Sequence, residues 1–280
     1  MVLFDIQKEC EELKERLRED GIVVSSCFCE WQSANDLLEI VQKYEWNVSE
    51  CLLITSQERS RQMAQQLGMA VVGYIEKHFE IPKTEVLLEC LEEISVNYLN
   101  KVYCHANGLP AIITETKRCY IRELTKEDMA TLYEILEEEE VSKFLPKKLG
   151  TKKEEIEKLI GYSSFVYSFF EYGYWGVFLK ETNELIGKAG FREGSWPLEA
   201  GYVIKYDFWG QGLATEVLSE LIVYGKEELG CEEFLVQMEE QNKASFRVAI
   251  KCGFCDTIQQ KVLENEDGSQ TIIKVLRFSM

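Results

Sequence analysis

One short stretch of this chain is especially informative about its fold. It reads Phe208-Trp209-Gly210-Gln211-Gly212-Leu213-Ala214-Thr215. The apolar residues after it recur at helical spacing as far as residue 229, so the glycines stand just before a helix. Backbone N–H groups and the helix dipole make such a helix N-terminus a binding site for anions. A tight turn that needs glycine for positive φ is the alternative explanation, and the turn alone defines no function.

The segments on both sides of this turn predict alternating strands and helices. Strands are expected at 120–124, 174–179, 185–192, 198–205 and 231–236, and helices after Thr125, over 153–170, over 213–229 and after Asn242. The polar turn Glu181-Thr182-Asn183 is expected to join two of the strands as a hairpin. Thr125 and Asp128 have the spacing of a capping box. The C-terminal half is therefore predicted to be α/β, with a meander of strands at its centre.

Four motifs in this half, taken in order, resemble those of the GNAT superfamily of N-acetyltransferases. The similarity is to the branch that includes ribosomal-protein N-terminal acetyltransferases. The motifs are Glu199-Ala200-Gly201-Tyr202, the turn at 209–215, Asn242-Lys243-Ala244-Ser245 and Gly253-Phe254. The resemblance implies a mixed α+β sheet domain that moves the acetyl group of acetyl-CoA to a primary amine. The acceptor would be a protein N-terminus or a small molecule.

The same resemblance implies which residues hold acetyl-CoA as cosubstrate. Gly210, Gln211, Gly212, Leu213, Ala214 and Thr215 are expected to hold the pyrophosphate, mostly by backbone amides. Trp209 precedes them where many family members have Gln or Arg. The backbone of Tyr202, Val203 and Ile204 is expected to pair with the pantetheine arm like an added strand. Asn242 would hydrogen-bond this arm near its thiol end, cap the helix that follows it, or do both.

The expected chemistry needs a proton acceptor and a proton donor. Since only a neutral amine attacks a thioester, a base must take its proton. Glu199 is our candidate base, with an ordinary strand carboxylate or a substrate clamp as the alternatives. Ser245 is our candidate acid for the leaving thiolate, with helix capping as the alternative. A backbone N–H near Val203 or Ile204 would stabilise the oxyanion. No Cys–His pairing indicates an acetyl-enzyme, so direct attack is expected.

The first part of the chain shows a different alternation. Apolar runs at 2–4, 22–24, 51–55, 69–75 and 86–88 are candidate strands, and amphipathic helices separate the first four. Such alternation predicts a small parallel sheet with helices on its faces. The arrangement resembles the Rossmann-like core of haloacid-dehalogenase-like phosphatases, without a cap insertion.

Several residues of this part depart from the phosphatase pattern. Asp5 stands where the family has its first aspartate, but Gln7 replaces the second, and Ser56 and Ser60 replace acidic residues. Because Mg²⁺ needs carboxylate ligands, the substitutions argue against phosphatase activity. We expect a degenerate domain over residues 1–113, used for docking or dimerisation, and a GNAT domain over 114–280. Asp5 is expected to cap the helix that follows it.

The composition restricts the classes of partner. A net charge of −18 without a basic patch disfavours nucleic-acid binding, and no apolar run is long enough for a membrane span. The N-terminus does not resemble a signal peptide, so a cytoplasmic location with reduced cysteines is expected. Neither the ten cysteines nor the two histidines form a recognisable metal site. A non-catalytic acyl-CoA-binding or regulatory module is the alternative function, and a homodimer is left open.

Overall fold

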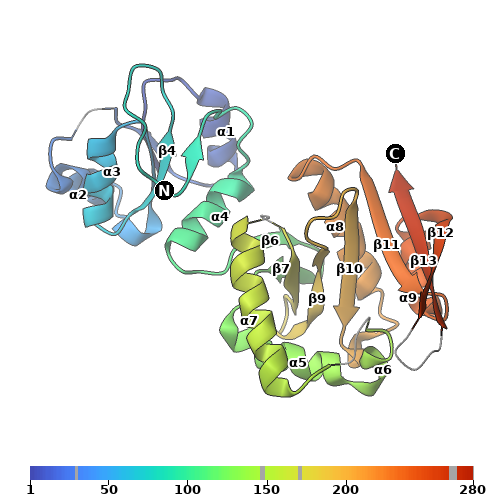
Figure 1. Cartoon of the computed structure of the whole chain (residues 1–280). Helices are drawn as coiled ribbons and strands as arrows, with labels where there is room; N and C mark the ends of the chain where they lie inside the picture. Colours follow the sequence, from blue (N-terminus) through green and yellow to red (C-terminus); the bar gives the residue numbers. More distant parts are fainter. Residues whose placement is uncertain (29–30, 146–148, 170–171, 265–269, 280) are drawn as a thin grey trace. The chain divides into compact units, whose positions relative to one another are not determined.

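The structure is a computed structural model that describes residues 1–28, 31–145, 149–169, 172–264 and 270–279. Its contacts divide the chain into two compact units, Met1–Ala111 and Ile112–Met280 (Figure 1). Strand β6 (Ile112–Glu115) belongs to the second unit because it pairs with the strand after it. The expected boundary after residue 113 falls inside this strand. No helix in the described ranges combines the length and the apolar character that a bilayer span requires.

The N-terminal unit contains a five-stranded sheet in which all pairs are parallel. Its strands are β1 (Val2–Asp5), β2 (Val24–Ser26), β3 (Leu52–Thr55), β4 (Ala70–Tyr74) and β5 (Leu87–Leu88), in the order β2-β1-β3-β4-β5. Helices α1 (Glu11–Glu19), α2 (Ala34–Lys43) and α3 (Glu58–Gln66) connect the first four strands, and α4 (Val96–Ala106) follows β5. Apolar clusters cover both faces, with Phe4 in one and Leu3 in the other. The predicted parallel sheet is confirmed, whereas the likeness to haloacid dehalogenases stays a prediction.

The expectation that Asp5 caps a helix is wrong. Helix α1 begins after Cys10 and has no side-chain cap. The buried carboxylate of Asp5 instead accepts hydrogen bonds from the Thr55 hydroxyl at 2.7 Å and from the Gln57 side-chain amide at 3.1 Å. The reason is topological, because β1 and β3 are parallel neighbours and their carboxyl ends meet at one edge of the sheet.

The C-terminal unit contains an eight-stranded mixed sheet. After β6 come β7 (Cys119–Arg122), β8 (Tyr174–Leu179), β9 (Leu185–Phe191), β10 (Leu198–Ile204), β11 (Glu233–Glu239), β12 (Cys255–Glu264) and β13 (Gln270–Ser279). The spatial order is β12-β13-β11-β10-β9-β8-β7-β6. Strands β10 and β11 are parallel, and the other neighbouring pairs are antiparallel. The mixed sheet confirms the predicted fold class, although β6, β12 and β13 were not predicted.

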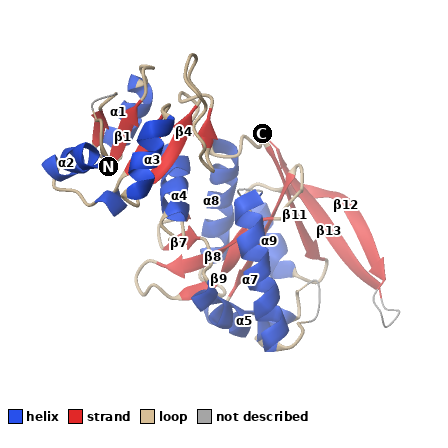
Figure 2. Ribbon diagram, turned by 60° about the vertical axis from the view of Figure 1, so that its left-hand side comes forward, coloured by secondary structure: helices blue, strands red, loops and turns tan. Residues whose placement is uncertain are grey.

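Helices cover both faces of this mixed sheet (Figure 2). They are α5 (Met129–Glu137), α6 (Glu139–Ser142), α7 (Lys152–Phe169), α8 (Leu213–Glu227) and α9 (Lys243–Lys251). On one face α5 packs against Phe178 and Leu185. On the other face Trp175 meets Tyr224 of α8 edge to face. We refer to these as the α5 face and the α8 face. Because side chains alternate along a strand, each residue of β10 belongs to one face or the other.

Candidate active site

Strands β10 and β11 are paired along only part of their lengths. The register joins Leu198 to Phe234, Glu199 to Leu235 and Ala200 to Val236, and the described chain shows no further pair between them. Both strands nevertheless continue, β10 to Ile204 and β11 to Glu239. Diverging strands leave backbone N–H and C=O groups on their facing edges for another partner. An extended ligand can supply that partner by pairing like a strand.

A cavity of about 870 Å³ occupies this opening. Residues of both faces line it, including Glu199 and Val203 on the α5 face and Tyr202 on the α8 face. Ser245 and Ala249 of α9 also line it. The structure thus brings the predicted base, the predicted acid and two of the three predicted pantetheine-pairing residues to one cavity. Its lining does not include Ile204, Trp209, Asn242 or the turn residues 210–215.

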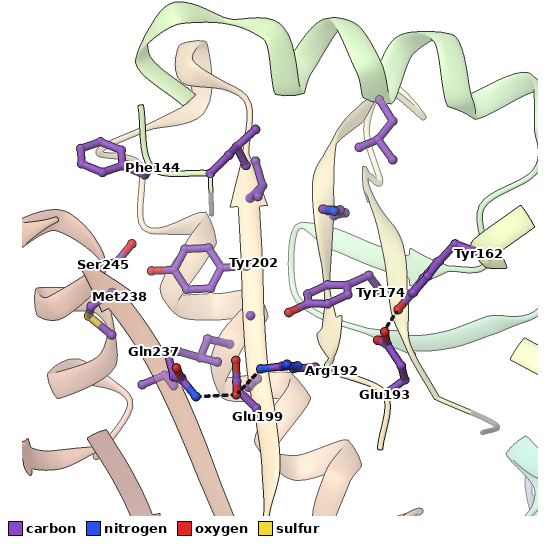
Figure 3. A pocket seen from close by; sticks show the side chains of 18 of the residues that line it. Phe144, Tyr162, Tyr174, Arg192, Glu193, Glu199, Tyr202, Gln237, Met238 and Ser245 are labelled. Carbon is purple, nitrogen blue, oxygen red and sulfur yellow. Dashed lines mark hydrogen bonds and ion pairs between the residues drawn. The ribbon is translucent and has the colours of Figure 1, made fainter. Parts of the chain in front are cut away.

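The carboxylate of Glu199 is held through one oxygen. Oε2 accepts a hydrogen bond from the Gln237 side-chain amide at 2.6 Å and lies 3.4 Å from the Arg192 guanidinium (Figure 3). The other oxygen, Oε1, has no hydrogen-bond partner among the described residues. Ser195 Oγ accepts from the Glu199 backbone N–H at 2.9 Å and fixes the strand at this point. The side chain is therefore oriented by its neighbours and keeps one oxygen available to a ligand.

The hydroxyl of Tyr202 is buried and makes no hydrogen bond within the described residues. Figure 3 shows it directed toward the side of the cavity where Ser245 lies. Burial raises the pKa of Tyr202 to about 12, although the Ser245 side chain lowers it by a smaller amount. The phenol therefore stays protonated at neutral pH. A buried hydroxyl without a partner costs free energy unless a ligand supplies one.

Aromatic side chains form the wall of the cavity on the α5 face. The Tyr174 ring stands over Gly201, where an added Cβ would lie 2.5 Å from the Tyr174 hydroxyl. Burial raises the pKa of Tyr174 to about 12, and the Glu199 carboxylate acts in the same direction. Tyr162 donates to Glu193 at 3.1 Å. Both tyrosines line the cavity.

The glycine turn has the backbone that its sequence predicts. Gly210 and Gly212 have φ values of 74° and 81°, and Gly212 is the N-terminal cap residue of α8 without a capping side chain. The first N–H groups of α8 therefore receive no side-chain acceptor. Arg118, which sequence reasoning did not single out, donates to the Gln211 carbonyl at 3.0 Å and pairs with Glu216 at 2.8 Å. Arg118 lies in the bend between β6 and β7, and its two contacts fix the glycine turn from there.

Two of the predicted cosubstrate residues also have structural roles. The Trp209 indole N–H donates to the Ile204 carbonyl at 2.6 Å, which ties the turn to the end of β10. The Asn242 side chain accepts from the Ser245 backbone N–H at 3.0 Å, so it caps α9. The capping alternative for Asn242 is confirmed. Its bond also fixes the residue that carries the candidate acid.

Sequence reasoning missed two residues that contribute to the cavity. Lys188 lies in the middle of β9, whose other residues are all apolar or glycine, and this isolated charge was the available signal. Gln237 belongs to β11, and its contact with Glu199 follows from the pairing of β10 with β11. No local pattern in the sequence points to this contact.

The comparison with protein families agrees with this geometry. Residues 118–255 match the family model of the acetyltransferase (GNAT) domain. Residues 118–255 of the C-terminal unit therefore form a GNAT acetyltransferase domain, and, together with relatives that are named N-acetyltransferases, this match supports an acetyl-CoA-dependent acyltransferase with acetyl-CoA as its cosubstrate.

Individual relatives give the same result. The chain is 29% identical over 145 residues to the uncharacterized N-acetyltransferase YoaA of Bacillus subtilis, covering 51% of this chain and 82% of YoaA. Its fold is similar to that of RimL, a ribosomal L7/L12 α-N-protein acetyltransferase. The apo form has a TM-score of 0.54 with 16% identity and covers 61% of this chain and 96% of RimL. The complex with coenzyme A has a TM-score of 0.51 with 16% identity, covering 60% and 98%.

Proposed function

We propose that the C-terminal unit transfers the acetyl group of acetyl-CoA directly to a primary amine, on a protein N-terminus or on a small molecule. The partial pairing of β10 with β11, with a cavity in the opening, carries this proposal. It provides unpaired strand edges for an extended ligand beside a carboxylate and a protonated phenol.

The residues around the opening fit the parts of acetyl-CoA. The N–H groups that begin α8 would hold the pyrophosphate, because a helix N-terminus without a cap favours a negative charge. The edge of β10 from Tyr202 to Val203 would pair with the pantetheine arm. The Ile204 carbonyl already accepts a hydrogen bond from the Trp209 indole. Any pairing of the pantetheine arm at Ile204 would therefore use the backbone N–H or the second lone pair of this carbonyl oxygen.

Bound acetyl-CoA supplies an activated thioester, and the residues of the cavity manage the protons. Glu199 Oε1 would accept the proton of the attacking amine, while Gln237 and Arg192 hold the other oxygen in place. Ser245 is our proposed proton donor to the leaving thiolate. The protonated Tyr202 hydroxyl would hydrogen-bond the ligand on the same side of the cavity. Gln237, Arg192 and Asn242 act as positioning residues.

For the N-terminal unit we keep the proposal of a degenerate haloacid-dehalogenase-like domain used for docking or dimerisation. The neutral partners of Asp5 support it, since Thr55 and Gln57 occupy the edge of the sheet that a phosphatase would use for acidic residues. Within the described ranges, no group of three or more potential metal-binding side chains occurs.

Calorimetric titration with acetyl-CoA tests the binding half of the proposal. The informative variant is Gly212→Glu, which places a carboxylate at the N-terminus of α8. Gly230→Glu is its matched control, because Gly230 also has positive φ (62°) and open space around its Cα, and it follows the other end of the same helix. Both substitutions carry similar backbone strain.

We expect micromolar binding by the wild type and by Gly230→Glu, and a loss of at least about a hundredfold in Gly212→Glu. Equal affinities in the two variants would contradict the assignment of the turn. Binding without transfer to any amine would support the alternative of a non-catalytic acyl-CoA-binding module.

A further inference from the structure

The ammonium group of Lys188 is an unpaired charge in the wall of the cavity. Its side chain is partly buried, and no carboxylate of the described residues lies within 4 Å of it. Its closest recorded interaction is with the Tyr174 ring, whose centroid is 5.1 Å from Nζ. Burial lowers the pKa of Lys188, and the more distant Glu193 and Glu155 oppose this effect. The cavity wall therefore holds an ammonium group with no carboxylate of the described residues beside it, and an anion bound there would pair with it and favour its charged form.

Several other charged residues that line the cavity are compensated, whereas Lys261 of β12, which also lines it, is exposed. Glu193 accepts a hydrogen bond from Tyr162, Glu199 is held by Gln237 and Arg192, and Lys158 pairs with Glu155 at 2.7 Å. Lys188 differs from these compensated residues because the described part of the chain contains no hydrogen-bond or ion-pair partner for its ammonium group.

The sheet places Lys188 at a defined distance from the proposed base. Val203 of β10 lies opposite Lys188 in the register, and Glu199 is on the same face of β10, four residues earlier. At a rise of about 3.3 Å per residue, the Cα atoms of Glu199 and Val203 are about 13 Å apart. Tyr174 stands between the two groups, with its hydroxyl above Gly201 and its ring near the ammonium. The α5 face of the cavity thus has a carboxylate at one end and a cation at the other.

We infer that the acceptor is a small amine carrying a carboxylate, an amino acid in the broad sense, with its amine at Glu199 and its carboxylate on Lys188. This inference rests on the proposed transfer to an amine and narrows its acceptor class. A protein N-terminus is disfavoured, since its α-carboxyl is consumed in a peptide bond and leaves Lys188 without an anion.

Matched pairs of acceptors test the inference. The panel contains glycine, β-alanine, 4-aminobutyrate and 6-aminohexanoate, each with its neutral carboxamide, together with short peptides that have a free N-terminus. Rates of CoA release give kcat/KM for each compound. Calorimetry of the same compounds with the CoA-bound protein gives affinity independently of turnover. The proteins are the wild type, Lys188→Met, Lys188→Arg and the control Lys158→Met, which removes a charge that is already paired.

We expect the best acid to exceed its amide by about tenfold or more in the wild type, as for one charge-assisted hydrogen bond. The ratio should fall to about one in Lys188→Met and persist in Lys188→Arg and Lys158→Met. The length of the acid that is used best indicates the distance between the Glu199 end and the Lys188 end of the site.

Three results would overturn the inference. These are equal use of acids and amides by the wild type, preference for peptide N-termini over every acid, and a preference for acids that survives in Lys188→Met. A protein that binds acetyl-CoA, but neither acetylates nor binds any of the acids, would also overturn the inference. Failure to bind acetyl-CoA is a different result, because it removes the proposed function itself.

Discussion

The two sheets of this chain satisfy their buried polar groups in different ways. At the carboxyl edge of the N-terminal sheet, Asp5 is bonded to side chains of the neighbouring strand segment. At the opening of the C-terminal sheet, Tyr202 and Lys188 line a cavity, and the buried Tyr202 hydroxyl has no hydrogen-bond partner among the described residues. A buried polar group without a partner costs about 1–3 kcal/mol of stability. Such groups indicate where a ligand completes the structure, whereas internally bonded ones indicate a scaffold.

The N-terminal unit also contains one buried polar group of this kind, because the Ser56 hydroxyl has no hydrogen-bond partner in the described chain. It lies immediately after β3, next to Asp5 and its partners. We expect acetyl transfer to depend on the C-terminal sheet, here called the open sheet, and not on the N-terminal sheet, here called the closed sheet.

The largest effect is expected for Glu199→Gln in the open sheet. Removal of the proposed base should lower kcat by about 10²–10⁴-fold, because positioned general bases contribute that much. The affinity for acetyl-CoA, measured by calorimetry, should change little. Glu193→Gln is the matched control, since it alters a carboxylate of the same cavity that already bonds to Tyr162. A Glu199→Gln protein with wild-type kcat would show that the carboxylate only positions its neighbours.

In the closed sheet, Asp5→Ala should affect stability and leave acetyl transfer unchanged. The change leaves the Thr55 hydroxyl and the Gln57 amide without their acceptor, which should lower the free energy of unfolding by about 1–3 kcal/mol. Urea denaturation measures this loss, and Asp20→Ala at the exposed end of α1 is the control. A large change in acetyl-CoA affinity would break the division of roles between the two sheets.

For Tyr202→Phe we expect activity to fall without a loss of stability. The hydroxyl makes no hydrogen bond within the described residues, so its removal should leave Tm unchanged or slightly raised. Transfer should slow by about tenfold if the phenol contacts the bound thioester, the size of a single hydrogen bond made in the transition state. The variants Ser245→Ala and Tyr202→Phe/Ser245→Ala complete a double-mutant cycle. Loss of Tm with full activity would make Tyr202 a purely structural residue.

The smallest effect concerns acid stability of the C-terminal unit. Burial raises the pKa of Asp128, but the Arg122 ion pair and the Thr125 hydrogen bonds outweigh it and leave the pKa below its ordinary value. The stabilisation is thus present above the unfolded-state value of about 3.9 and lost as the pH falls through the lower folded value. Relative to Asp128→Asn, the wild type should gain on the order of 1 kcal/mol at pH 7 and nothing at the lowest pH. A difference independent of pH would contradict this assignment.

The sequence was most informative where local chemistry repeats. Glycines with positive φ at 210 and 212, the cap at Asn242 and the alternation of the first four N-terminal strands all follow from local rules, and the structure shows them. The cap expected at Asp5 was wrong because a contact between two strands, fifty residues apart, overrides a local preference. The strands β12 and β13 were not predicted, although β13 contains the β-branched run Thr271-Ile272-Ile273, which is a strand signal.

The site was predictable only in part for the same reason. The resemblance to a family pointed to Glu199, Ser245 and Tyr202, which the structure places around one cavity. Lys188, Gln237 and Arg118 owe their positions to pairing between strands or to packing beside the turn, and no motif encodes such contacts. Lys188 was visible as a charge inside an apolar strand, yet its meaning required the register of β9 against β10.

The bond between the Trp209 indole and the Ile204 carbonyl has an optical consequence. Trp209 is 37% exposed and joins the glycine turn to the end of β10, the two segments that we propose to receive the cosubstrate. Its emission therefore depends on the polarity and order of both segments at once. Of the five tryptophans in the chain, this one gives the protein an intrinsic fluorophore at the proposed cosubstrate site.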